Sequence, residues 1–296
     1  MNKEYLIGVD LGGTKIEGGL VDLSGKIVKK IEYPTEAAKG KKQVIEKIVD
    51  IVQKLRKGQV MGVGVGCPGQ VDVKKGIVIT APNLPGWNNV NLKRILEERL
   101  RLPIFMENDA NCFALAESKC GQGRKIENML CFTLGSGIGG GIIINGRLYT
   151  GSGGMGGELG HMTINKDDDD KCNAGHKGCL EVYSCGRGIE KRYKDATKKK
   201  ATAHEISDMA KSNKKAKQII VEGGEALGMA FASYLNIFNP ELIILGGGLS
   251  KSKLLVETAE KTMRKYAFPH AEKGVKIILS KMQDAGIIGA ASIIHR

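Results

Sequence analysis

The chain has 296 residues, of which 42% are hydrophobic, and 45 Lys and Arg against 32 Asp and Glu give it a net charge of +13. This length suits two lobes around a cleft, and the scattered Lys residues with a single Trp favour a solvated surface over a nucleic-acid interface. No stretch approaches the ~20 apolar residues of a membrane span. The N-terminus lacks a signal-peptide pattern and there are seven Cys, so we expect a cytoplasmic protein with reduced thiols.

The first part of the chain reads as a sheet with accompanying helices. Residues 4–33 alternate apolar and polar side chains in three pieces separated by Gly-containing turns, which predicts a β-meander. The other elements predicted here are, in order, a helix over 41–57, a strand over 60–66, a helix over 91–100, a strand over 102–108 and a helix over 108–119.

The opening pattern recurs over residues 128–149, where we predict a strand, a glycine-rich loop, a strand, a tight turn and a third strand. This recurrence indicates an internal duplication, and two related α/β lobes that face one another form a natural ligand cleft. After a polar loop over 165–178, the predicted elements are helices across 186–237 with breaks near 198–203 and 211–214, a strand over 241–248, a helix over 251–267, a strand over 275–279 and a helix over 285–295.

A first candidate for phosphate binding is the turn that follows the first strand, with Asp10, Gly12, Gly13, Thr14 and Lys15. Its glycines let backbone N–H groups approach a phosphate closely, and Asp10 at the strand end is placed to hold Mg²⁺. The turn is not a Walker A loop, because Thr-Lys stands in place of Lys-Thr and a strand follows in place of a helix. A plain hairpin turn is the alternative interpretation.

Two further glycine runs are candidates for the same role. The run over 135–141 matches G-x-G-x-x-G, but a strand follows it where a dinucleotide fingerprint needs a helix, so we predict a phosphate-cradling hairpin. The second run, at 246–248, ends a buried strand before a helix. That position suits an adenosine or phosphate contact, and a simple strand-to-helix turn explains it nearly as well.

A candidate general base lies in the segment Glu107-Asn108-Asp109-Ala110-Asn111, at a strand end and a helix start. Asp109 is placed there to face the cleft and to accept the proton of an attacking hydroxyl during phosphoryl transfer. Capping of the following helix by Asn108 or Asp109 explains the same residues equally well.

Metal-ligating residues gather between positions 158 and 181. Two Cys and two His within about twenty positions are typical of a structural zinc site, and these are His161, Cys172, His176 and Cys179. Since their spacing is irregular, a polar loop with unpaired thiols is the alternative. Two carboxylates of the same stretch, Glu158 and Glu181, are candidates to bind sugar hydroxyls.

The segments DLGGTK, CPGQVD, APNLPGW, ENDAN, TLGSGIGGG, GELGH, GCLE and LGGG occur along nearly the whole chain. In these segments and their order, the chain resembles the ROK family of repressors, open reading frames and sugar kinases. The resemblance implies an α/β, actin-like (ribonuclease H-like) fold of two lobes with a central cleft. It further implies catalysis by Asp109, with ATP and Mg²⁺ as the donor complex.

The resemblance also assigns ligand contacts. The sugar is expected on Gly69, Asn83, Asn108, Asp109, Glu158, His161 and Glu181. The ATP phosphates are expected on Gly12, Gly13, Thr14, Lys15, Gly135, Ser136, Gly137 and Gly139. The adenosine side is expected on Gly246, Gly247 and Gly248.

One departure from the family concerns its zinc knuckle, Cys-x-Cys-Gly-x-x-Gly-Cys. Here Ala174 replaces the second Cys, while His161, Cys172 and Cys179 are retained. His176 is the candidate fourth ligand, and water in that position or no metal at all are the alternatives.

These features predict an ATP-dependent hexose kinase that phosphorylates a 6-hydroxyl, with glucose as the first choice of acceptor. The alternatives are N-acetylmannosamine, N-acetylglucosamine, fructose or allose as acceptor, polyphosphate as donor, and a catalytically silent sugar-sensing module. Repressors of the family carry an N-terminal helix-turn-helix. Because the first strand is predicted to begin within a few residues of Met1, we expect no nucleic-acid partner.

The lobes are expected to divide between Asn108 and Asp109. Residues 1–108, completed by the helix over 285–296, form the smaller lobe, and residues 109–284 form the larger lobe with the zinc-knuckle loop. The resemblance implies a homo-oligomer, either a dimer or a tetramer. Since no apolar stretch is long enough for a membrane span, we expect no membrane partner.

Overall fold

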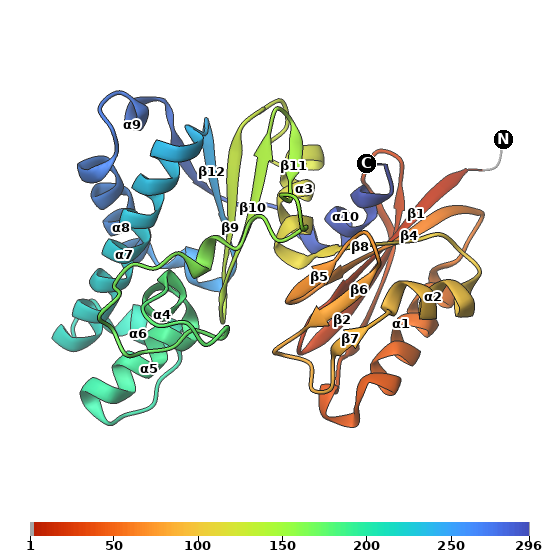
Figure 1. The fold of residues 1–296 in the computed structure, drawn as a ribbon, viewed down its shortest axis with the longest axis horizontal. Coiled ribbons are helices and arrows are strands. Elements are labelled where there is room, and N and C mark those ends of the chain that lie inside the picture. Colours follow the sequence, from red (N-terminus) through yellow and green to blue (C-terminus); the bar gives the residue numbers. More distant parts are fainter. Residues whose placement is uncertain (1–2, 296) are drawn as a thin grey trace.

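The computed structural model describes residues 3–295, so Met1, Asn2 and Arg296, which the predicted lobes include, lie outside it. Each half of the molecule is built on a five-stranded sheet (Figure 1). The elements of the first half are β1 (Glu4–Leu11), β2 (Lys15–Asp22), β3 (Ile27–Pro34), α1 (Lys41–Leu55), β4 (Gln59–Cys67), α2 (Leu92–Leu100) and β8 (Ile104–Asn108). Between β4 and α2, a small sheet contains β5 (Gln70–Asp72), β6 (Ile77–Thr80) and β7 (Asn88–Val90).

The second half contains the second sheet and most of the helices. Its elements are α3 (Asp109–Cys120), β9 (Met129–Leu134), β10 (Ile138–Ile144), β11 (Arg147–Tyr149), α4 (Leu180–Ser184), α5 (Gly186–Thr197), α6 (Ala203–Met209), α7 (Lys214–Phe238), β12 (Leu242–Gly246), α8 (Lys253–Tyr266), α9 (Ala271–Gly274) and β13 (Lys276–Leu279). The chain then returns to the first half as α10 (Ala285–Ser292). Within residues 3–295, no helix is both long and apolar enough to cross a membrane.

The two large sheets share one topology. Their strand orders are β3-β2-β1-β4-β8 and β11-β10-β9-β12-β13. In each sheet an antiparallel meander comes first, and two strands parallel to its first strand extend the other edge. This repetition agrees with the internal duplication expected from the sequence.

The predicted elements are present with small shifts at their ends. Their apolar residues fall on one face of each element, as the sequence periodicity indicated. In α1, for example, Val44, Ile48, Val52 and Leu55 are fully buried. Gly18 on β2 leaves room beneath α1, since a Cβ there would stand 2.2 Å from a side-chain carbon of Ile51. The small sheet was not predicted, because strands of three or four residues are too short to show a period.

Helix α10 lies directly on the first sheet, and two glycines make this contact as close as backbone allows. A Cβ on Gly8 of β1 would stand 2.0 Å from the carbonyl oxygen of Ile287, and one on Gly64 of β4 would stand 1.8 Å from that of Ala290. The glycines in these strands are therefore required for packing. Such packing is what the proposed completion of the smaller lobe by α10 requires.

Helix α3 joins the two halves, because it packs on α10 with one face and on β10 with the other. On the α10 side, a Cβ on Gly289 would lie 1.8 Å from the carbonyl oxygen of Cys112. On the β10 side, Cβ atoms on Gly139 and Gly141 would lie 2.7 and 2.5 Å from those of Ala110 and Ala114. Small residues thus fix the position of α3 between the lobes.

We predict that Gly289→Ala lowers the free energy of unfolding by about 1–3 kcal/mol, because the added methyl group forces α10 away from α3. Gly274→Ala is the matched control, since a Cβ there meets no atom within 4 Å. Thermal and denaturant unfolding of the two variants beside the wild type measures the difference. Equal stability of the two variants would contradict the proposed tight contact.

Candidate active site

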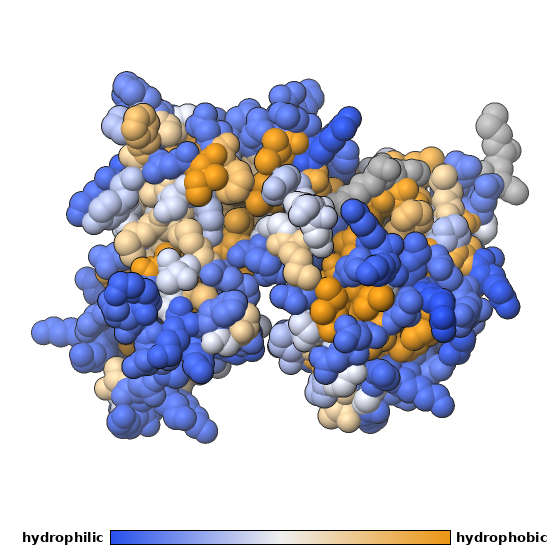
Figure 2. Space-filling view, in the orientation of Figure 1, coloured by the Kyte–Doolittle hydropathy of each residue, from blue (hydrophilic) through white to orange (hydrophobic). Residues whose placement is uncertain are grey.

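A cleft of about 300 Å³ opens between the two halves of the molecule. The surface is hollowed between the lobes, with mostly hydrophilic residues around the hollow (Figure 2). The sequence-predicted residues that line the cleft are Gly69, Asn83, Asn108, Asp109, Gly135, Ser136, Gly137, Gly139, Glu158, His161, Glu181 and Gly247. The structure therefore gathers segments from both lobes at one place.

Of the two interpretations of the ENDAN segment, the structure confirms helix capping, and the capping residue is Asn108. Asn108 is the N-cap of α3, because its Oδ1 accepts hydrogen bonds from the backbone N–H groups of Ala110 (2.9 Å) and Asn111 (3.2 Å). Its Nδ2 also donates to the carbonyl oxygen of Gly69 at 3.0 Å. Since Asn108 caps the helix, the carboxylate of Asp109 is left open to the cleft, where it accepts one bond from the Ala110 N–H.

The environment of Asp109 raises its pKa to about 6. The main cause is desolvation by the protein around the carboxylate, although the side chain of Asp109 is exposed to the cleft. The hydrogen bond from Ala110 lowers the pKa in part, and the negative charge of Glu158 raises it. A carboxyl group with such a pKa is ionised near pH 7 and remains basic enough to take a proton.

Asp10, at the end of β1, lies beside the first turn of α10. A Cβ on Gly286 would stand 2.0 Å from Oδ2 of Asp10, so only glycine fits there. Desolvation, together with the charges of Asp109 and Glu17, raises the pKa of Asp10 to about 7. A half-buried carboxylate in this environment gains from a bound cation.

The turn that follows Asp10 is a tight hairpin. The N–H of Gly12 donates to the carbonyl oxygen of Lys15 at 3.0 Å, and the hydroxyl of buried Thr35 donates to that of Gly12 at 2.7 Å. The ammonium of Lys15 is paired with Glu17 (2.8 Å) and Glu32 (3.2 Å). The cleft is not lined by Asp10 or by the turn residues Gly12, Gly13, Thr14 and Lys15. Gly13 does contact Asn83, with 3.1 Å between its would-be Cβ and that of Asn83.

Glu181 connects the loop before β10 to the metal-ligand segment. Its buried carboxylate accepts hydrogen bonds from the backbone N–H groups of Ile138 (3.1 Å) and Asn173 (3.2 Å). Gly137 lies against the same carboxylate, 2.7 Å from a would-be Cβ to Oε2. The position of the 135–137 loop thus depends on Glu181.

Arg187 is a cleft residue that the sequence did not predict. Its Nε donates to the carbonyl oxygen of Ser136 at 3.0 Å, and its guanidinium borders Gly137. Among the described residues that line the cleft, it is the sole Lys or Arg. No motif signals this role, because Arg187 lies in a helix start and reaches the glycine loop only through the fold.

A second cavity, of about 470 Å³, shares Gly135 and Ser136 with the cleft. Its other lining residues come from α5, α6 and the turn after β12, and they include Gly248, Glu190, Thr202, Ser207, Lys251 and Ser252. The Thr202–Glu205 capping box that starts α6 is readable from the sequence and was missed. Gly246 lines neither cavity, because it packs on the ring of Phe113.

Three of the four predicted metal ligands come together. The ligand atoms of His161, Cys172 and Cys179 all lie within 4.8 Å of one another. Nδ1 of His161 is buried with no hydrogen-bond partner, as expected for an atom that faces a metal. The group does not include His176, which is exposed and whose ring centroid lies 6.4 Å from that of His161.

We predict that Asp10→Asn stabilises the metal-free protein at pH 8. The pKa of Asp10 is about 7 in the folded chain and about 4 in the unfolded chain, so stability falls as the pH rises between these values. The substitution removes this loss, by roughly 1–4 kcal/mol at pH 8, and has little effect at pH 4. Thermal unfolding across this pH range, with Asp208→Asn as an exposed control, would refute the expectation if the two variants behaved alike.

Similarity to known proteins shows to which family the chain belongs. The profile of the ROK family matches residues 6–296. A glucokinase from Thermotoga maritima is 38% identical over 99% of this chain and 98% of its own length, and a xylose repressor from Caldicellulosiruptor bescii is 31% identical over 97% of this chain and 77% of its own.

Similar solved structures belong to the same family. A ROK family glucokinase from Streptomyces griseus, in complex with glucose and AMPPNP, is 31% identical and superposes with a TM-score of 0.82 over 98% of each chain. The fold is thus the actin-like fold predicted from the sequence. With a family match along nearly its whole length and relatives above 30% identity, the chain belongs to the ROK family.

Proposed function

We propose that this chain is an ATP-dependent hexose kinase that transfers the γ-phosphate to the 6-hydroxyl of glucose. The observation that carries the proposal is the junction of two cavities at Gly135 and Ser136, with the carboxylate of Asp109 in one of them. The glucokinase names of the Thermotoga and Streptomyces relatives support glucose as the acceptor.

The proposed base is Asp109. As the 6-hydroxyl oxygen attacks the γ-phosphorus, its proton passes to Asp109 and the bond from phosphorus to the ADP oxygen breaks. The helix cap supplied by Asn108 supports this role, because it leaves Asp109 free to meet the sugar. Asn83, Glu158, His161, Glu181 and Gly69 are the proposed sugar contacts, and Glu181 also holds the glycine loop.

The donor spans both cavities in this proposal. Adenosine would lie in the second cavity near Gly247 and Gly248, and the phosphates would cross the loop of Gly135, Ser136 and Gly137 toward Asp109. Polyphosphate has no nucleobase to fill the second cavity, so the presence of this cavity favours ATP as the donor. The turn of Gly12, Gly13, Thr14 and Lys15 would approach the phosphates from the other lobe.

Mg²⁺ fits Asp10, because a desolvated carboxylate oxygen is a ligand that this cation prefers. When bound, it neutralises charge on the transferring phosphate. Zinc fits His161, Cys172 and Cys179, whose two sulfurs and one nitrogen suit its tetrahedral geometry and include an otherwise unpartnered atom. We propose that it fixes the ring of His161 beside Glu158, 3.8 Å from Nε2 to Oε2.

An assembly of two or four copies is also part of the proposal. Met229 and Ile237 of α7 and the nearby Phe268 are 38%, 69% and 70% exposed, and a second copy would cover them. Light scattering on purified protein measures the number of copies.

We predict that Asp109→Asn lowers turnover by ~10²–10⁴-fold while the affinity for glucose changes little. The wild-type rate should fall below pH 6, because protonated Asp109 accepts no proton.

A coupled assay with glucose, fructose and N-acetylated hexosamines, plus calorimetry of glucose binding, separates the role of Asp109 as a base from a role in sugar binding. Asp72→Asn, in the small sheet, is the control. Turnover near that of the wild type would remove Asp109 as the base, and inactivity of the wild type on every sugar would favour a sensing module.

We predict that Arg187→Ala raises KM for ATP roughly 10- to 150-fold and leaves KM for glucose nearly unchanged, because a charge-assisted contact to phosphate is worth ~1.5–3 kcal/mol. Arg187→Lys should restore part of the loss, and Arg94→Ala, on the surface of α2, is the control. Measurement with polyphosphate in parallel tests the donor. Faster phosphorylation from polyphosphate than from ATP would overturn the assignment of ATP.

A further inference from the structure

The metal-ligand segment has one donor fewer than a closed zinc site needs. We propose that the metal of the preceding proposal is held by three protein ligands and keeps an open fourth position, filled by solvent and exchangeable for a small thiolate. The inference rests on the proposed metal site and is independent of the identity of the sugar.

The two nitrogens of His161 have different surroundings. Nε2 lies 3.8 Å from Oε2 of Glu158, on the side of the cleft, whereas Nδ1 is buried and has no partner. The thiols of Cys172 and Cys179 are near the ring and are themselves buried. Nδ1 and the two sulfurs therefore make up the protein's contribution to the site.

No fourth His, Cys, Asp or Glu joins this group anywhere in residues 3–295. The turn over 172–175 is closed by a hydrogen bond from the Gly175 N–H to the Cys172 carbonyl oxygen at 2.9 Å, and it presents Ala174, which is exposed and has no donor atom. His176 is exposed, and its backbone carbonyl rather than its ring meets Cys179, 4.0 Å from its sulfur. Two Cys and one His with an open position is an arrangement of exchangeable rather than structural zinc.

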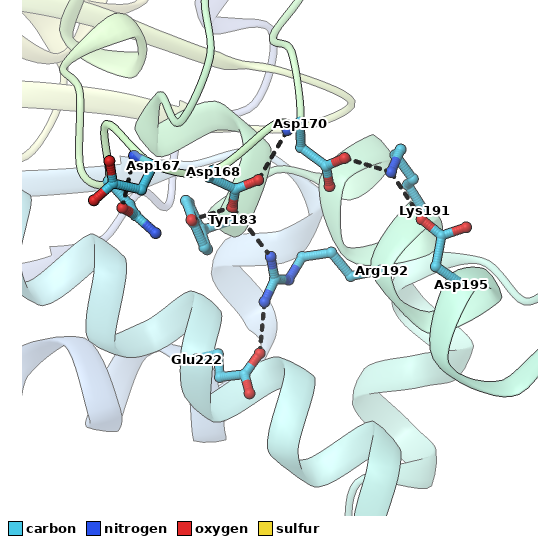
Figure 3. Close-up of polar contacts among 9 residues, drawn as sticks. Asp167, Asp168, Asp170, Tyr183, Lys191, Arg192, Asp195 and Glu222 are labelled. Atoms are coloured by element: carbon cyan, nitrogen blue, oxygen red, sulfur yellow. Dashed lines mark hydrogen bonds and ion pairs between the residues drawn. The ribbon is translucent and has the colours of Figure 1, made fainter.

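The segment has anchors of its own, which explains how it tolerates an incomplete metal site. Asp168 accepts a hydrogen bond from the hydroxyl of Tyr183 and pairs with Arg192 at 3.8 Å, and Arg192 pairs with Glu222 at 2.7 Å (Figure 3). Asp170 pairs with Lys191 at 2.6 Å, as the same view shows. Two of the four consecutive Asp residues thus hold the loop to α4 and α5, and through Arg192 to α7, without a metal.

The metal-ligand segment reaches the cleft beside Ala174. Asn173, next to Ala174, lines the cleft and donates its backbone N–H to Glu181, which also holds Ile138 of the glycine loop. If a thiol replaced solvent on a bound metal, a metal–sulfur bond would form, the metal–oxygen bond would break, and the thiol proton would go to water. A ligand exchanged there is therefore separated from the phosphate loop by one backbone turn and one carboxylate.

The test uses the full chain loaded with Co²⁺ in place of zinc, because the absorption spectrum of cobalt reports its ligands. Titration with 2-mercaptoethanol should shift the spectrum of the wild type with saturation at one thiol per chain. Ala174→Cys should show the shifted spectrum from the start, ignore added thiol, and hold zinc more than about tenfold more tightly in chelator competition. Ala174→Ser, of similar size, should respond to thiol as the wild type does.

His176→Ala decides between solvent and the fourth ligand expected from the sequence. The open-site proposal requires this variant to keep the wild-type spectrum and zinc affinity. A wild-type spectrum that does not respond to thiol, a spectrum changed by His176→Ala, or the absence of bound cobalt would each overturn the proposal. The wild-type titration decides even if Ala174→Cys fails to fold, and glucose phosphorylation in the separate kinase assay is unaffected by this outcome.

Discussion

Everything in the cleft depends on how closely α3 can approach its two neighbours. Its backbone lies against Gly289 of α10 on one side and its alanines lie on Gly139 and Gly141 of β10 on the other. Any side chain at those glycines would move the helix, and the helix carries Asp109 on its first turn. The geometry around Asp109 is therefore set by contacts among residues that have no chemistry of their own.

A second constraint on the cleft is the charge of its carboxyl groups. Asp10 and Asp109 are held in surroundings that disfavour their ionised forms, and Glu158 adds a further desolvated carboxyl whose pKa is raised. Such a site repels a bare polyanion. Arg187 and a cation at Asp10 would together reverse that repulsion, so that a metal-bound donor enters more readily than a free one.

Much of this could be predicted from the sequence, because long elements carry their period in the chain. The duplicated meanders, α1 and the interrupted helices before β12 are examples. Asp109 could be named, but its separation from the capping role of Asn108 needed coordinates, since both residues suit both roles. The glycines of β10 were assigned to phosphate alone, whereas packing on α3 already requires Gly139 and Gly141. The contact of Arg187 with the glycine loop, the ion pairs of Lys15 and the lining of the second cavity form only when the fold brings the side chains together. Local sequence patterns therefore do not predict them.

The position of α10 has a consequence for the order in which the protein assembles. This helix covers β1 and β4 of the first sheet, yet it is encoded after the entire second half. On the ribosome, the first sheet can form its hydrogen bonds while one of its faces, built around Gly8 and Gly64, still awaits its cover. The second half is synthesised during that interval, and its own sheet needs no later segment beyond β13. The lobe that begins the chain is thus the last to be completed, which exposes its uncovered face to chaperones or to aggregation for most of translation.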